Sequence, residues 1–92
     1  MELVRARVLI SGRVQGVNFR ASAREQARLH QILGWVRNLE DGRVEAVFEG
    51  PRPAVKQVVS WCYIGPGHAR VEQVDVAWER PTGQEQGFQI QW

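Results

Sequence analysis

Residues 5–20 read RARVLISGRVQGVNFR, and the change of pattern within this stretch decides the fold. Over residues 5–11, apolar side chains recur at every second position, which is typical of a β-strand with one buried face. Gly12 and Gly16 interrupt the alternation and predict a loop that ends at Asn18. The stretch therefore predicts a strand followed directly by a glycine-bounded loop. The apolar face of the strand consists of Ala6, Val8 and Ile10.

The residues from Phe19 to about His30 favour a helix. Ala23 and Ala27 follow Phe19 at four-residue spacing, so these side chains share one face of the helix. Because the two alanines are small, we expect this face to lie close against a sheet.

A hairpin is predicted after the helix. The dipeptide Asp41-Gly42 signals a tight turn, since glycine supplies the positive φ that such turns need. It separates strands predicted at residues 32–39 and 43–49. The side chains of the second strand that we expect to face the core are Val44, Ala46 and Phe48.

A second helix and two more strands complete the predicted elements. Gly50 and the two prolines that follow it break the chain and start the helix, and the glycines on either side of Pro66 end it. Residues 71–79 alternate as a strand, and a loop over residues 81–87 leads to a short final strand over residues 88–92. The side chains expected to pack are Val55, Val58, Val59 and Cys62 of the helix, Val74, Val76 and Trp78, then Phe88, Ile90 and Trp92, together with the other tryptophans, Trp35 and Trp61.

The order β-α-β-β-α-β, with a short extra strand at the C-terminus, places the chain in the α+β class. Two helices on one face of a mainly antiparallel sheet form a ferredoxin-like split β-α-β sandwich. Right-handed crossovers put the first and third strands side by side in the centre. The loop at residues 12–18 and the end of the second strand then lie near the same end of the sheet. We expect residues 1–92 to form a single domain.

The composition excludes several classes of protein. Apolar residues make up 43% of the chain, yet no apolar run approaches the roughly 20 residues of a membrane helix. Charges interrupt the N-terminus at once, so we expect no signal peptide. Cys62 is the sole cysteine and cannot form an internal disulfide. We therefore expect a cytoplasmic monomer with no membrane partner. The net charge of +2 suits an anionic ligand but does not single out nucleic acid.

The loop and the helix start that follows it form a candidate anion site. Successive N–H groups of such a loop can form a concave nest, and those of a first helical turn lack intrahelical partners. Arg20 lies in that turn, and its guanidinium matches a phosphoryl group through two parallel hydrogen bonds. From these residues alone an alternative stays open, in which Gly12 and Gly16 only shape a turn and Arg20 is a solvated charge.

Residues 12–20, GRVQGVNFR, resemble the signature segment of the acylphosphatases, a family of small ferredoxin-like enzymes. Residues 34–39, GWVRNL, followed by DGRVE at residues 41–45, resemble the second signature of the same family. The resemblance covers essentially the whole chain, and it implies hydrolysis of acyl phosphates to a carboxylate and inorganic phosphate, without a metal or a cofactor. Further segments similar to the family are residues 65–72, 81–83 and 88–90.

The resemblance also implies roles for individual residues. Arg20 matches the arginine that holds the phosphoryl group, and Asn38 matches the asparagine that orients the attacking water. Taken alone, Asn38 has a second interpretation, because an asparagine before a hairpin often bonds its own backbone. The backbone N–H groups that match the phosphate cradle belong to Val14, Gln15, Gly16, Val17 and Asn18.

The chain departs from the family at His30-Gln31, where relatives commonly have Leu-Gly. We expect Gln31 to take the left-handed conformation that glycine prefers, at a cost of about 1 kcal/mol. This departure affects the end of the first helix and not the chemistry.

The sequence lacks the residue patterns that other functions would need. His30 and His68 are far apart in the pattern and lack clustered carboxylate or cysteine partners, so we expect no metal site. An RNA-recognition domain on this fold would carry exposed aromatic residues on its first and third strands, where this chain has only Phe48, on the inward side. A non-catalytic anion-binding module of a larger protein remains as a second alternative.

Overall fold

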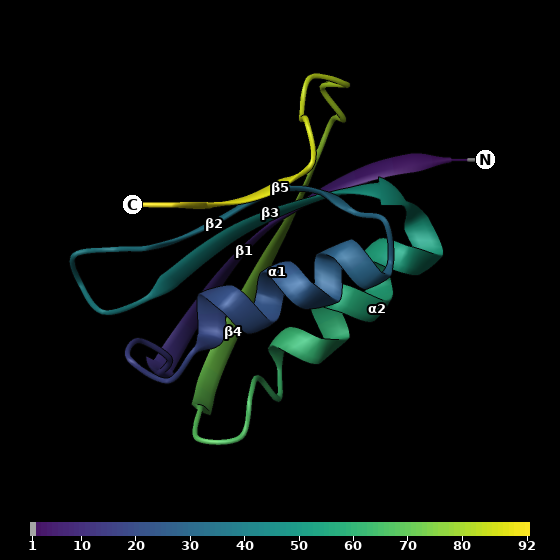
Figure 1. Cartoon of the computed structure of the whole chain (residues 1–92). Helices are drawn as coiled ribbons and strands as arrows, with labels where there is room; N and C mark the ends of the chain where they lie inside the picture. Colours follow the sequence, from purple (N-terminus) through teal and green to yellow (C-terminus); the bar gives the residue numbers. More distant parts are fainter. Residues whose placement is uncertain (1) are drawn as a thin grey trace.

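The computed structural model describes residues 2–92, in which a five-stranded sheet carries two helices on one of its faces (Figure 1). The predicted α+β class and βαββαβ order, with a short last strand, are confirmed. In chain order the elements are β1 (Leu3–Arg13), α1 (Phe19–Leu29), β2 (Leu33–Asn38), β3 (Val44–Pro51), α2 (Arg52–Cys62), β4 (Arg70–Glu79) and β5 (Phe88–Gln91).

The strands lie in the order β4-β1-β3-β2-β5, so the predicted pairing of the first and third strands at the centre is confirmed. β1 pairs antiparallel with β3 and β4, β3 pairs antiparallel with β2, and β5 pairs parallel with β2. β1, β2 and β5 therefore run in the same direction, and their C-terminal ends lie at the same end of the sheet. In Figure 1 the loop after β1, the β2–β3 turn and the C-terminus all lie at the left.

The core lies between the sheet and the two helices. Ala23 and Ala27 of α1 are completely buried, which agrees with a close approach of this helix to the sheet. From β5, Phe88 stacks on Phe48 with ring centroids 5.5 Å apart. Alternate side chains of β1 and β3 complete this part of the core, as predicted: Ala6, Val8, Ile10, Val44, Ala46 and Phe48.

Helix α2 buries the predicted stripe against the sheet. Val55, Val58, Val59 and Cys62 are its buried residues. Burial raises the pKa of the Cys62 thiol to about 12. At neutral pH the thiol is therefore protonated and a poor nucleophile, which agrees with its predicted place in the core.

Helix α1 ends in the left-handed conformation expected at Gln31, which has a φ of 58°. The N–H of Gln31 donates to the carbonyl of Arg28 at 3.1 Å, and the N–H of Ile32 donates to the carbonyl of Ala27 at 2.7 Å. These two bonds form a Schellman motif. The hydrogen-bond pattern usual with glycine is thus kept with glutamine.

Several element ends differ from the sequence prediction. β1 spans Leu3–Arg13 and not residues 5–11, so Gly12 lies in the strand and not in the loop. β3 continues through Gly50 to Pro51, where a break was expected, because β1 begins at Leu3 and pairs with Pro51. Proline is tolerated at a strand end, where it removes one ladder hydrogen bond. β5 ends at Gln91, and Trp92 is 94% exposed, so the prediction that it packs on the sheet is wrong.

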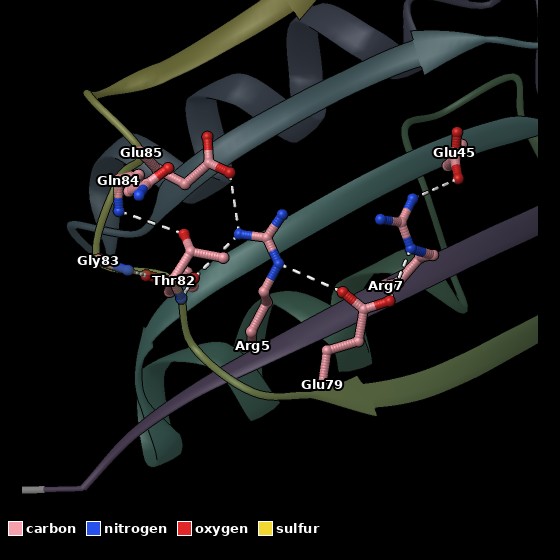
Figure 2. A network of polar contacts seen from close by, with 9 residues as sticks. Arg5, Arg7, Glu45, Glu79, Thr82, Gly83, Gln84 and Glu85 are labelled. Carbon is pink, nitrogen blue, oxygen red and sulfur yellow. Dashed lines mark hydrogen bonds and ion pairs between the residues drawn. The ribbon is translucent and has the colours of Figure 1, made fainter.

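The sheet face away from the helices carries a network of ion pairs (Figure 2). Arg5 of β1 lies opposite Glu49 of β3 and donates from Nη1 to its carboxylate at 2.9 Å. The same guanidinium reaches Glu85 at 2.8 Å and Glu79 at 3.3 Å. Most of these partners come from other strands, so the network ties the sheet together. The remaining pairs on this face are Arg7–Glu45, Arg7–Glu79 and Arg37–Glu45.

Glu49 also fixes the β4–β5 loop to the sheet. Its carboxylate accepts the N–H groups of Thr82 at 3.1 Å and Gly83 at 2.9 Å. Burial alone would raise the pKa of Glu49, but these N–H groups and Arg5 stabilise the carboxylate and lower the pKa below its ordinary value. The arginines of the network are engaged by carboxylates, and β1 and β3 place no aromatic side chain on this face.

Candidate active site

A cavity of about 190 Å³ lies where β1, β2 and β5 end. The loop after β1, the first turn of α1, the end of β2 and the β5 segment each supply part of its wall. Because the three strands run in the same direction, their C-terminal ends all lie at the end of the sheet where the cavity is. Of the residues predicted for the site, the cavity brings together Val14, Gly16, Asn18, Arg20 and Asn38. The other lining residues are Phe19, Ala21, Ile90 and Trp92.

Gly16 and Asn18 give the loop its shape. Both have positive φ, 73° and 67° respectively, with Val17 between them in the ordinary negative range. Such an alternation forms the N–H-lined concavities called nests. Within residues 2–92, the N–H groups of Gln15, Gly16, Val17 and Asn18 donate no hydrogen bond. They are therefore free to donate to an anion.

Both ends of this loop are anchored in the core. Val14 and Phe19 are each 1% exposed, and the ring of Phe19 contacts Trp61 of α2 with centroids 5.2 Å apart. The N–H of Val14 donates to the carbonyl of Gly12 at 3.1 Å, so this predicted member of the cradle already has an acceptor. The other four N–H groups are presented on a backbone that packing holds in place.

Gln15 and Val17 do not line the cavity. Gln15 donates from Nε2 to the carbonyls of Leu39 at 2.8 Å and Arg43 at 3.0 Å. Val17 packs, partly buried, against the core. The Gln15 bonds tie the loop to the β2–β3 turn, next to Asn38. Sequence reasoning considered only the backbone of Gln15, because no local pattern reveals acceptors that are 24 and 28 residues away.

Arg20 lies in a helical turn that lacks negative charge. No side chain caps the start of α1, and its first turn contains no acidic residue. The positive end of the helix dipole and the guanidinium of Arg20 therefore reinforce each other. Within residues 2–92 Arg20 forms no ion pair, and its guanidinium carbon lies 4.3 Å from the ring centroid of Trp92. This local excess of positive charge favours a phosphate group.

Asn38 ends β2 at the same cavity. In the sheet it pairs with Val44, whose other neighbour is Ile10 of β1. Its Oδ1 atom is buried without a hydrogen-bond partner, so the interpretation in which this side chain bonds its own backbone is wrong. A buried amide oxygen without a partner is costly. The cavity therefore contains an acceptor suited to the O–H of a water molecule.

Ile90 and Trp92 line the cavity, and sequence reasoning missed both as site residues. It assigned them to packing because they alternate with Phe88. Their place follows from the parallel pairing of β5 with β2, in which Ile90 lies opposite Val36. A local pattern does not specify such a pairing, so the sequence held no direct signal for these two residues.

The donors at the cavity are N–H groups and a guanidinium, which suit an anion. Within residues 2–92, no three His, Cys, Asp or Glu side chains gather where they could hold a metal ion. No helix in this part of the chain is long and apolar enough to cross a membrane.

The fold and the cavity together define a ferredoxin-like α+β protein with a cavity at its first β–α connection whose donors suit an anion. A family model described as Acylphosphatase matches residues 6–90. The chain therefore belongs to the acylphosphatase family, as the sequence resemblance implied.

Individual relatives match over nearly their whole length. The chain is 72% identical to an acylphosphatase from Roseiflexus sp. (strain RS-1), over 100% of this chain and 99% of that protein. It is 66% identical to an acylphosphatase from Chloroflexus aurantiacus, with 100% of both chains covered. The crystal structure of acylphosphatase from Bacillus subtilis is similar with a TM-score of 0.93 at 34% identity, over 97% of this chain and 99% of that one.

Proposed function

We propose that the protein hydrolyses acyl phosphates to a carboxylate and inorganic phosphate by direct attack of water. The observation that carries this proposal is the convergence of Arg20, without a carboxylate partner, and Asn38, with an unpaired buried oxygen, on one cavity. Family membership supports the same reaction. The free N–H groups of the loop supply the remaining donors.

In the proposed mechanism, the free N–H groups of residues 15–18 and the guanidinium of Arg20 hold the phosphoryl group and neutralise its charge. Asn38 accepts a hydrogen bond from the attacking water and places it in line with the leaving group. The water oxygen bonds to phosphorus as the bond from phosphorus to the acyl oxygen breaks, and the carboxylate leaves with that electron pair. Because a carboxylate is a good leaving group, no general acid is required.

The proton of the water passes to a phosphate oxygen, since an asparagine cannot accept it at neutral pH. We therefore expect the rate of hydrolysis to change little with pH around neutrality. A bell-shaped profile governed by a side-chain pKa would contradict this step.

Several further properties belong to the same proposal. The reaction needs no metal or cofactor, and residues 1–92 act as one domain and as a monomer. We place the protein in the cytoplasm, with no nucleic acid among its partners. The donor set of the site supports a reaction without a metal, the net charge of +2 does not single out nucleic acid, and the single cysteine agrees with a reducing compartment.

The central test is hydrolysis of benzoyl phosphate, without added metal, by the wild type and two variants. Arg20→Ala should lower kcat by about 10²–10³-fold or more, because it removes a donor to the transition state, and it should also lose phosphate binding. Asn38→Ala should lower kcat by about 10²-fold, as expected when a reactant is misplaced, while it keeps its affinity for phosphate. Full activity of Asn38→Ala would show that the water-orienting role is wrong.

Arg13→Ala is a matched control, because Arg13 is an exposed arginine of the same segment that does not line the cavity. It should retain both activity and phosphate affinity. Inorganic phosphate at about 100 times its Kd should stabilise the folded wild type by about 2.7 kcal/mol through mass action. The Tm should therefore rise in the wild type and Arg13→Ala but not in Arg20→Ala.

A further inference from the structure

Trp92 lies beyond the last strand and contacts the cavity through its ring. Its exposed fraction is 94%, so the core does not hold it. The guanidinium carbon of Arg20 lies 4.3 Å from the centroid of this ring. A cation over the face of a tryptophan is attracted by the quadrupole of the ring. Arg20 and Trp92 therefore hold each other at the mouth of the cavity.

Three other arginine–tryptophan contacts within residues 2–92 allow a comparison. Their guanidinium carbons lie farther from the ring centroids, at 5.3 to 5.9 Å. Each of these arginines also has a carboxylate partner, whereas Arg20 has none within residues 2–92. At Arg20 the ring thus takes the place that a carboxylate occupies elsewhere. The three contacts are Arg7–Trp35, Arg37–Trp35 and Arg52–Trp78.

We propose that Trp92 is a positioning residue, which orders the guanidinium of Arg20 for the phosphoryl group without neutralising its charge. The inference rests on the proposed function of Arg20. A carboxylate at this place would also order the guanidinium, but it would compete with phosphate for the same N–H groups. A ring does not compete in this way, because it attracts the cation through its quadrupole and offers no carboxylate oxygen to those N–H groups.

The expected effect of losing the ring follows from this role. Without Trp92, Arg20 samples more conformations, and substrate binding must order it. That cost falls equally on the bound substrate and on the transition state, so KM rises and kcat is unchanged. Because a cation–π contact at an exposed site is weak, the increase should be roughly two- to fivefold.

The experiment compares Trp92→Leu and Trp92→Phe with the wild type, using benzoyl phosphate and acetyl phosphate as substrates. Trp92→Leu should raise KM for both substrates, and the inhibition constant of inorganic phosphate, by the same two- to fivefold. Trp92→Phe should recover part of the loss, because it restores a ring face. Equal effects on the two substrates identify the shared phosphoryl group as the point of action.

Trp78→Leu is the matched control, since Trp78 is also exposed and also lies beneath an arginine, at 5.9 Å, away from the cavity. It should leave KM and phosphate inhibition unchanged. The inference is overturned if Trp92→Leu behaves like the wild type, if only benzoyl phosphate is affected, or if kcat falls at constant KM. If Arg20→Ala retains activity, the proposed function fails instead, and the two failures are therefore distinguishable.

Discussion

Arg5 on the outer sheet face and Arg20 at the cavity are the same residue type in opposite surroundings. Arg5 is 7% exposed and contacts the carboxylates of Glu49, Glu79 and Glu85. Arg20 has no carboxylate partner within residues 2–92 and contacts a tryptophan ring. A buried charge needs partners if the fold is to tolerate it, whereas an arginine that is left unpaired at a cavity is available to a ligand.

Uncharged polar groups show the same contrast. On the outer face the N–H groups of Thr82 and Gly83 are both accepted by Glu49. At the cavity the N–H groups of Gly16 and Asn18 and the Oδ1 of Asn38 have no partner within residues 2–92. Folded proteins leave few buried polar groups unpaired. The cavity therefore holds a buried acceptor without a partner beside loop N–H groups that are free for a ligand.

The largest effect on stability is expected from breaking the outer network. Glu49→Ala removes the carboxylate shared by Arg5, Thr82 and Gly83, and leaves a buried guanidinium with less compensation. We expect the free energy of unfolding, measured by urea denaturation, to fall by about 3–5 kcal/mol. The affinity of the remaining folded molecules for phosphate should change much less, because Glu49 does not line the cavity.

Glu49→Gln is the control for this change. Glutamine keeps an oxygen that can accept the two loop N–H groups, so the loss should be smaller than for alanine. If Glu49→Ala lowers the free energy of unfolding by less than about 1 kcal/mol, the network contributes no more than exposed ion pairs do. The carboxylates around Arg5 would then not be needed to stabilise a buried arginine.

A smaller and gradual effect is expected from acid. Burial would raise the pKa values of Glu45 and Glu49, but their hydrogen-bond donors outweigh it and lower both pKa values below 4.5. The unfolded chain therefore takes up protons at higher pH than the folded chain. The stabilisation is fully present above the unfolded pKa and is lost as the pH falls through the folded pKa.

Unfolding free energies measured from about pH 7 to about pH 3 should accordingly decline mainly below about pH 4.5. Glu49→Gln should show a shallower decline, since it lacks one of the two carboxyls. A decline centred near pH 6.5, the ordinary range of histidine, would assign the effect to other groups.

The smallest change in stability is expected at the cavity. Asn38→Leu replaces an unpaired amide by an apolar group of similar size. The free energy of unfolding should stay within about 1 kcal/mol of the wild type or should rise, although kcat for benzoyl phosphate should fall by about 10²-fold, as for Asn38→Ala. A destabilisation as large as that of Glu49→Ala would show instead that Asn38 supports the fold.

Much of the fold could be predicted because its signals are local. The alternation over residues 5–11, the hairpin at Asp41-Gly42 and the stripe on α2 each occupy a few consecutive positions. The left-handed end of α1 at Gln31 followed from a single departure from the family pattern. The extension of β3 to Pro51 was missed because it depends on Leu3, which lies at the other end of the pairing.

The site was predictable only in part for the same reason. Arg20 and the loop lie in one segment, so motif and helix start indicate them together. Trp92 reaches the cavity through the parallel pairing of β5 with β2. Outside the site, Glu49 is likewise held by partners from two distant segments, β1 and the β4–β5 loop. The positions of such residues depend on tertiary contacts between distant parts of the chain. The hydrophobic periodicity and the composition of the sequence do not reveal these contacts.

The burial of Cys62 gives the molecule a reporter of its own opening. A thiol-alkylating reagent needs both access and a thiolate, and the folded protein denies it both. Alkylation therefore proceeds through molecules in which α2 has left the sheet, and its rate measures how often this happens. Since Cys62 is the sole cysteine, each chain can be alkylated only once, and the extent of alkylation reports the fraction of molecules that have opened and reacted.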